Sequence, residues 1–234
     1  MDFSFLSDPR YHILGAFWLN VQLTLWSAVG ALILGTVLAG MRVSPVPLMR
    51  GFATVYVNIV RNIPLTLIII MMSQVLYTQL GVKLASRGPG AKGAISFIYH
   101  QNLRLAILGF ILYTSTFVAE AIRSGINTVP PGQAEAARAI GLTFSQNLRI
   151  VVLPQAFRAV IAPLASVLIA LTKNTTVASA IGVAETALLM NTLIENEADK
   201  FVAVFIAIAA GFVIITLPVG LILGWVAKRA TVNR

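Results

Sequence analysis

Two stretches of the chain, residues 11–41 and 201–227, are long and apolar and contain no Asp, Glu, Lys or Arg. A helix that crosses the hydrocarbon core of a bilayer needs about 20 predominantly apolar residues, and both stretches exceed this length. A buried helix of a water-soluble protein rarely runs so far without a charge. We therefore interpret both as membrane-spanning helices, and the composition of the chain, 58% hydrophobic and 11% charged, fits this interpretation.

Three further apolar stretches meet the same criterion, so we predict an all-α integral membrane protein with five transmembrane helices in a single domain, residues 1–234. The segment 175–194 is apolar but interrupted by Glu185, and we expect a short re-entrant or interfacial helix there. The N-terminus has no basic segment and no small-residue cleavage site, so we expect the first span to remain in the protein. The predicted spans cover residues 13–41, 52–80, 103–126, 156–174 and 201–227.

The charges of the loops predict the orientation of the chain. Basic residues dominate after the first span, between the third and fourth, and at the C-terminus, whereas acidic residues gather in the N-terminal arm and before the last span. The positive-inside rule then puts the N-terminus outside and the C-terminus in the cytoplasm, which requires an odd number of spans. Only the loop with Lys83, Arg87 and Lys92 disagrees, because it would lie outside. The basic residues used are Arg42, Arg50, Arg123, Arg138, Arg149, Arg158, Lys228, Arg229 and Arg234, and the acidic ones are Asp2, Asp8, Glu195, Glu197 and Asp199.

Several classes of function are disfavoured by what the sequence lacks. The net charge is +9, but the basic residues stand singly between apolar runs rather than in a stripe, so we expect no nucleic-acid partner. There is no glycine-rich phosphate loop ending in Gly-Lys-Ser/Thr, so we expect no ATP site in this chain. With no cysteine, only His12 and His100, and neither His-Glu-x-x-His nor Gly-x-Ser-x-Gly, we expect neither a metal site nor an enzyme.

The segment 127–155, between spans three and four, carries the most informative pattern. Two prolines end span three, and residues 134–140 are good helix formers. Gly141 suits the position after a helix, where a positive φ is needed. A second helix is then expected to run to Leu153, with Pro154 beginning the return into the membrane. The pattern predicts a rigid helix–turn–helix knob on the cytoplasmic side.

This string resembles the EAA loop of the permease subunits of ATP-binding-cassette (ABC) importers, in which Glu-Ala-Ala is followed at fixed spacing by Gly, Ile and Leu-Pro. Here Val151 replaces the Ile. In that family the loop is the coupling helix that docks into a groove of the ATPase subunit. The matching residues, which the resemblance assigns to ATPase coupling, are Glu135, Ala136, Ala137, Gly141, Leu153 and Pro154.

The same resemblance implies the partners and the location. The expected assembly pairs this chain with a second permease subunit, expected to be a paralogue, a dimer of ATPase subunits that bind ATP and Mg²⁺, and an extracytoplasmic solute-binding protein. It implies a multi-pass protein of the bacterial cytoplasmic membrane, surrounded by lipid. The chain itself is expected to bind no cofactor and to move its substrate by alternating access.

Three further elements resemble the permeases for polar amino acids, namely histidine, glutamine and glutamate. They are Arg-Asn-Ile-Pro-Leu at 61–65, Phe-Val-Ala-Glu at 117–120 with Arg-Ser-Gly-Ile at 123–126, and Lys-Asn-Thr-Thr at 173–176 with Ile-Gly-Val-Ala-Glu at 181–185. The overall likeness to the actinobacterial glutamate permeases implies glutamate as the substrate. Glutamine, aspartate, histidine or arginine remain alternatives, and an ATP-independent channel or carrier is the alternative from a different class.

Four ionisable residues, Arg61, Glu120, Lys173 and Glu185, interrupt apolar segments. A charge at the centre of a bilayer costs about 2.5–3.5 kcal/mol on insertion scales. One interpretation has these charges line a substrate path, and the other has them pair with one another or reach the interface. For Glu120 we favour a pair with Arg123, one helical turn away. The candidate path residues are Arg61, Asn62, Thr66, Glu120, Lys173, Asn174, Thr175 and Glu185.

Prolines and small residues add expectations about the helices. Pro64 is expected to kink or break the second span, and Pro163 is a candidate to do the same in the fourth. Small residues recur every four positions in two spans, which either indicates close helix contacts or reflects how common such residues are in membrane helices. They are Ser27, Ala31, Gly35 and Ala39 in the first span and Ala203, Ala207 and Gly211 in the last.

Overall fold

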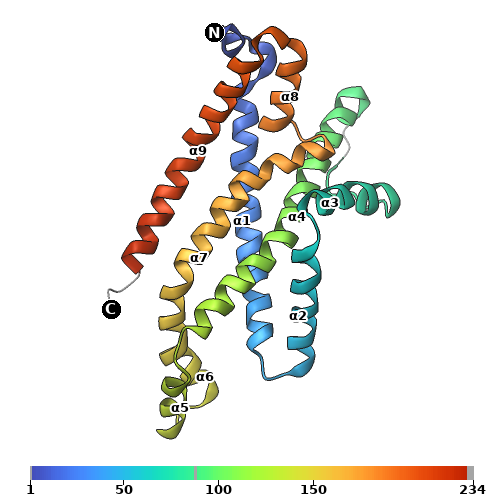
Figure 1. The fold of residues 1–234 in the computed structure, drawn as a ribbon. Helices are drawn as coiled ribbons and strands as arrows, with labels where there is room; N and C mark the ends of the chain where they lie inside the picture. The colour runs from blue at the N-terminus through green and yellow to red at the C-terminus, as the bar shows by residue number, and fades with distance from the viewer. Residues whose placement is uncertain (1, 87–88, 231–234) are drawn as a thin grey trace.

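The computed structural model describes residues 2–86 and 89–230, and within these ranges it contains helices and turns but no strand. Four helices in this part of the chain are long and apolar enough to cross a membrane. They form one elongated bundle (Figure 1). These helices are α1 (Ile13–Val43), α4 (Gly90–Asn127), α7 (Leu153–Asn174) and α9 (Phe201–Ala230).

The predicted second span is broken into two helices. α2 (Pro47–Asn62) and the following helix, α3 (Leu65–Met71) with a π-helical extension Met72–Gln79, meet at an angle of 102°. Pro64 lies at the break, where it donates no backbone hydrogen bond, so the predicted break is confirmed. The bent pair supplies a fifth crossing as one broken span. Figure 1 shows α3 projecting sideways from the bundle.

The shorter helices cap the two ends of the bundle. The expected short helix after the fourth span is present as a 3-10 segment followed by α8, which lies at the N-terminal end in Figure 1. The knob helices α5 and α6 lie at the opposite end. The short elements are η1 (Ser4–Ser7), η2 (Pro9–Tyr11), α5 (Pro131–Ala139), α6 (Phe144–Asn147), the π-helical η4 (Leu148–Val152), the 3-10 helix η5 (Thr175–Ile181), α8 (Thr186–Asn196) and η6 (Ala198–Lys200).

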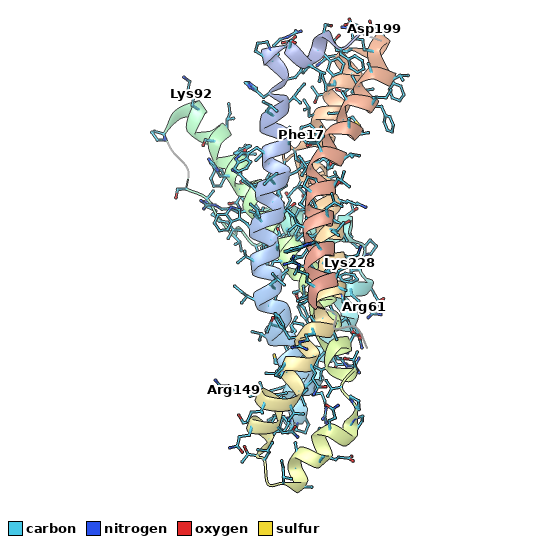
Figure 2. The ribbon with its side chains drawn as sticks, turned by 90° about the vertical axis from the view of Figure 1, so that its left-hand side faces the viewer. Phe17, Arg61, Lys92, Arg149, Asp199 and Lys228 are labelled. Atoms are coloured by element: carbon cyan, nitrogen blue, oxygen red, sulfur yellow. The ribbon has the colours of Figure 1, made fainter. Side chains whose placement is uncertain are left out.

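The separation of acidic and basic loops agrees with the predicted orientation. Asp199 lies at one end of the bundle and Arg149 near the other, beside the knob (Figure 2). Lys92 lies toward the Asp199 end, so the basic loop that disagreed with the charge rule stays on the side assigned to it. Arg87 and Arg234, which also entered the charge argument, lie outside the described residues.

The helices differ from expectation at three places. α4 begins at Gly90 rather than near residue 103. α7 follows η4 without interruption, so Pro154 does not separate a loop helix from the fourth span; it lies in the first turn of α7, where its missing N–H costs little. Pro163 lies inside a continuous α7 and does not break it. Proline is tolerated inside membrane helices because neighbouring helices, hydroxyl side chains and small local adjustments satisfy the backbone group that it frees.

The small-residue stripes mark close helix contacts. Ser27 is fully buried, and a Cβ atom added to Gly35 of α1 would lie 2.5 Å from Val118 of α4. A Cβ atom added to Gly211 of α9 would lie 2.2 Å from the ring of Phe17 on α1. Both distances are far below van der Waals contact, so these helices approach one another as closely as they do because glycine stands at the crossings.

A buried apolar cluster fixes the base of the projecting α3 arm. Ile69 of α3 packs with Leu23 of α1, Leu105 and Phe110 of α4, and Leu171 of α7, and all five are at most 1% exposed. The arm is therefore anchored at its start, and Tyr77 near its far end lies against Phe97 of α4, with ring centroids 6.1 Å apart.

Candidate coupling loop and translocation path

The knob has a defined turn between its two helices. Gly141, with φ of +91°, follows α5, its N–H donates to the Arg138 carbonyl (2.9 Å), and the N–H of Leu142 donates to the Ala137 carbonyl (3.1 Å). This pair of bonds is the Schellman motif, which requires a residue that accepts positive φ. The predicted role of Gly141 as the residue that ends the helix is confirmed.

Side chains tie the knob into one unit. The amide of Asn147, which is buried, donates to the Ala134 carbonyl (2.8 Å) across the two helices. Thr143 and Gln146 form a capping box at the start of α6. Gln155 of α7 donates to Gln133 of α5 (2.5 Å), which brings the two halves of the EAA-like pattern together. The sequence analysis missed Asn147, although the Thr-x-x-Gln spacing just before it is a recognisable signal.

The outer surface of the knob combines exposed apolar residues with polar and charged ones. Glu135 is exposed, as are Ala136 and Gly141, whereas Ala137 is 5% exposed and packs inward. Ile140 and Phe144 are 80% and 63% exposed at the tip. The knob that carries these two side chains lies at the far end of the bundle (Figure 1).

Glu120 of α4 is the centre of a cluster of charges. Its carboxylate accepts a hydrogen bond from Arg42 of α1 at 2.5 Å and lies 3.5 Å from Arg61 of α2 and 3.8 Å from Arg123. The predicted neighbour Arg123 is present, but its contact is the longest of the three. The side chain of Arg42 is only 8% exposed, whereas those of Arg61 and Arg123 are nearly half exposed. Three guanidinium groups around one carboxylate leave this cluster positively charged.

The break between α2 and α3 places polar groups beside this cluster. Arg61 is in the last turn of α2, and Asn62 follows it with its amide bonded to the Asn58 carbonyl (2.6 Å). Asn62 and Thr66, on the two sides of the break, are both exposed. Of the predicted path residues, Arg61 and Glu120 are 3.5 Å apart, whereas Asn62 and Thr66 flank the break that follows Arg61.

Thr175 and Glu185 belong to a second, buried cluster. The amide of Asn20 on α1 donates to Thr175 Oγ1 (2.9 Å) and to Glu185 Oε2 (3.1 Å), and its oxygen accepts from the backbone N–H of Thr186 (3.1 Å). Glu185 caps α8 by accepting from two backbone N–H groups of its first turn, at 2.8 and 3.3 Å. A carboxylate is favourable at the N-terminus of a helix. Both Thr175 and Glu185 are fully buried, and Asn20, an amide in an apolar span, is the partner that the sequence analysis missed.

Asn174 and Lys173 lie at the end of α7. Asn174 lines a cavity of about 340 Å³ between α4 and α7, and Lys173 is exposed beside it. Most of the lining is apolar, with hydroxyl and amide groups spaced among the apolar atoms. Such a site has groups that can hydrogen-bond a small polar solute. The polar lining residues are Tyr113, Thr114, Ser166 and Asn174.

The bundle, the broken second span and the rigid cytoplasmic knob define the class of protein, a permease subunit of an importer. Residues 31–232 match the sequence profile of the family described as "Binding-protein-dependent transport system inner membrane component". The chain belongs to this family. It is thus an ABC importer permease, a multi-pass transport component of the cell membrane rather than an enzyme, as the sequence predicted.

Relatives and solved structures agree over nearly the whole chain. The chain is 55% and 54% identical to the "Glutamate transport system permease protein GluC" of Corynebacterium efficiens and of Corynebacterium glutamicum, covering 97% of this chain and 98% of each relative. It is 30% identical to the "Probable glutamine ABC transporter permease protein GlnM" of Bacillus subtilis, covering 97% of this chain and 94% of that relative. The fold matches a structure described as "Crystal structure of an amino acid ABC transporter with histidines" with a TM-score of 0.82 at 24% identity, covering 98% of this chain and 99% of that one.

Proposed function

We propose that this permease carries glutamate inward across the cytoplasmic membrane by alternating access. The observation that carries the proposal is the identity of 54–55% over nearly the full length to two proteins named as glutamate transport permeases. The charge of the Glu120 cluster supports it, because three arginines against one carboxylate attract an anion to the inner half of the bundle. Glutamate has one net negative charge at neutral pH, whereas glutamine and histidine do not.

The substrate path that we propose follows the exposed members of the predicted set. Arg61, Asn62 and Thr66 at the α2–α3 break would meet the carboxylates of the substrate, and Asn174 with Lys173 would line the path further toward the outside. Glu120 would hold Arg61 in place rather than contact the substrate directly. Support for this division comes from exposure, since Thr175 and Glu185 are buried and bonded to Asn20. For these two we propose a role in holding the α7–α8 turn against α1.

For the coupling loop we propose docking on the ATPase dimer, where ATP and Mg²⁺ bind. Glu135, Ala136 and Gly141 would lie at or near the contact, Ala137 would support it from within, and Leu153 and Pro154 would join the knob to the fourth span. The exposed Ile140 and Phe144 give this surface apolar area to bury. Because α7 continues directly from the knob, a movement of the knob would pass into the span without a flexible joint.

The second permease, which we propose is a paralogue, would cover the α3 arm. Leu67, Ile70, Met71, Val75 and Leu80 along this arm are between 36% and 67% exposed, and they project from the bundle where the protein offers them no further cover. The binding protein would dock at the opposite end from the knob, where the acidic loop with Glu195 and Asp199 lies.

Competition for uptake tests the substrate. The assembled transporter in proteoliposomes, supplied with its binding protein and internal ATP, is given labelled glutamate and an excess of one unlabelled amino acid. The proposal predicts that unlabelled glutamate abolishes uptake and that glutamine, histidine and arginine leave most of it. If glutamine, histidine or arginine abolished glutamate uptake and was itself taken up, that amino acid would be the substrate instead of glutamate. The importer class would be unaffected by this result.

A further inference from the structure

An apolar groove of about 840 Å³ runs along α7, between α1 and α4 on one side and α9 on the other. It contains none of the proposed path residues and lies in the half of the bundle nearer the knob. At about 30 Å³ per molecule this space would hold roughly 28 waters, which its lining would leave largely without hydrogen-bond partners. Apolar residues that line it include Leu32, Ile122, Leu164, Leu168 and Leu223.

A single arginine stands in the lining of this groove. Arg158 of α7 is exposed, and within residues 2–86 and 89–230 its side chain makes neither a hydrogen bond nor an ion pair. An arginine beside an apolar groove of a membrane protein needs a counter-charge or access to the headgroup region. If an apolar helix of another subunit filled the groove, it would bury the Arg158 guanidinium without a counter-charge.

The register of α7 and α9 brings a second arginine to the same depth. A Cβ atom on Gly220 of α9 would lie 3.8 Å from Ile169 of α7, and the two helices run in opposite directions. Arg229 follows Gly220 by nine residues, and Val160 precedes Ile169 by nine. Both steps descend about 13 Å at 1.5 Å per residue, so Arg229 lies at the level of Val160, within one turn of Arg158 along the bundle. Nine residues are about two and a half helical turns, so Arg229 points away from α7 and marks only the depth.

Trp225 marks this depth as the membrane interface. It is 54% exposed, and the guanidinium of Arg229 lies 3.9 Å from the centre of its ring. Tryptophan side chains concentrate at the level of the lipid headgroups. Both arginines therefore lie at the depth of the phosphates of the cytoplasmic leaflet, and Arg158 lies in the lining of the apolar groove.

We propose that this groove binds an anionic glycerophospholipid of the cytoplasmic leaflet, with its phosphate beside Arg158. One acyl chain would lie along Leu164, Leu168 and Leu223 and fill the space between α7 and α9. Basic residues between transmembrane helices on the cytoplasmic side bind anionic headgroups, whereas a choline headgroup would bring another cation to the same place. The bound lipid would act as a wedge that holds α9 at its distance from α7.

Photo-crosslinking in the assembled transporter tests the site directly. Two phospholipid probes with the same diazirine-bearing acyl chain, one phosphatidylglycerol and one phosphatidylcholine, are reconstituted at equal amounts, and labelled peptides are identified by mass spectrometry. Labelling of the groove residues is normalised to labelling of the outward face of α1 around Leu25, which is 57% exposed. The proposal predicts groove labelling that is several-fold stronger with phosphatidylglycerol.

Three variants separate charge from packing. Arg158→Gln is expected to lower the phosphatidylglycerol preference about fivefold, the effect of one basic side chain near a bilayer surface. Arg158→Lys should keep it, and Arg50→Gln, an exposed arginine on the same side but outside the groove, should leave it unchanged. Equal labelling by both probes would mean that the groove contacts lipid without selecting an anionic headgroup. Absence of groove labelling, with α1 labelled, would mean that another subunit fills it, and either result overturns the proposal.

Discussion

Arg42 of α1 donates a hydrogen bond of 2.5 Å to Glu120 of α4, across 78 positions of the sequence. The pair ties the cytoplasmic end of the first span to the helix that leads into the knob, and Arg61 joins it from the broken second span. One carboxylate thus connects three elements.

Replacing Glu120 by Gln is expected to destabilise the protein. The side chain of Arg42 is 8% exposed and would lose its counter-charge. Because Glu120 itself is 28% exposed, the expected loss is about 1–3 kcal/mol, below the 3–5 kcal/mol of a fully buried pair. Thermal unfolding of the purified transporter measures it. Asp8→Asn, which removes the exposed pair with Arg10, is the matched control and should change the midpoint little.

Arg61→Gln should slow transport without weakening substrate capture. If Arg61 lines the path, its loss is expected to lower the maximal rate of glutamate uptake about tenfold, equivalent to roughly 1.4 kcal/mol of barrier. The KM should stay nearly constant, because the external binding protein captures the substrate. Uptake kinetics of the variant beside Arg50→Gln provide the comparison. An unchanged maximal rate in Arg61→Gln would remove this residue from the path.

Gly35→Ala is expected to destabilise the folded protein, whereas Gly40→Ala is not. A Cβ atom at position 35 would lie 2.5 Å from Val118 and 2.8 Å from the Ser115 carbonyl, whereas one at position 40 would meet nothing within 4 Å. We expect a loss of about 1–3 kcal/mol for the first change, because a packed helix crossing has to open. The midpoint of thermal unfolding distinguishes the two variants, and equal midpoints would contradict the close α1–α4 crossing.

Acid should release the N-terminal arm from the acidic loop. Lys200, at 2.7 Å, and then Tyr11 hold the pKa of Glu197 below its usual value of 4.5. A carboxylate with a lowered folded-state pKa stabilises the contact above its ordinary pKa, and this contribution is lost as the pH falls through the folded-state value. The chain has no cysteine, so a spin label on Ser7→Cys reports the arm alone.

The spin-label mobility should be low at neutral pH and should rise only in acid, below the usual glutamate pKa of 4.5. Glu197→Gln should give high mobility at every pH, because the contact then has no charge to lose. A label that stays immobile throughout acid titration in the unmutated background would show that other contacts hold the arm.

Local signals carried most of what the sequence could predict. Long apolar runs identified the spans, Pro64 identified the break, and Gly141 identified the turn of the knob, because each depends on one residue or one continuous stretch. The 102° direction of α3 was not predictable, since it depends on how Ile69 packs against helices distant in the sequence.

The sequence could not predict polar pairs between helices that are far apart in the chain. Arg42 was used only as a loop charge, and Asn20 was not singled out, because their partners lie 78 and 165 positions away. Such pairs form only when the bundle brings the helices together. The candidate path residues therefore fall into separate clusters in the structure. Their spacing along the chain does not reveal which residues lie together.

The most direct test of the account is ATP-dependent glutamate uptake by the complete transporter with changes in the knob. Glu135→Ala and Gly141→Ala alter the coupling surface and its positive-φ turn, whereas Gly132→Ala, with no positive φ and nothing within 4 Å of an added Cβ, is the matched control. The account predicts that uptake collapses in the first two while the complex remains assembled, and that it persists in the control. Uptake that is independent of ATP, or unchanged in all three variants, would contradict an ATPase-coupled importer.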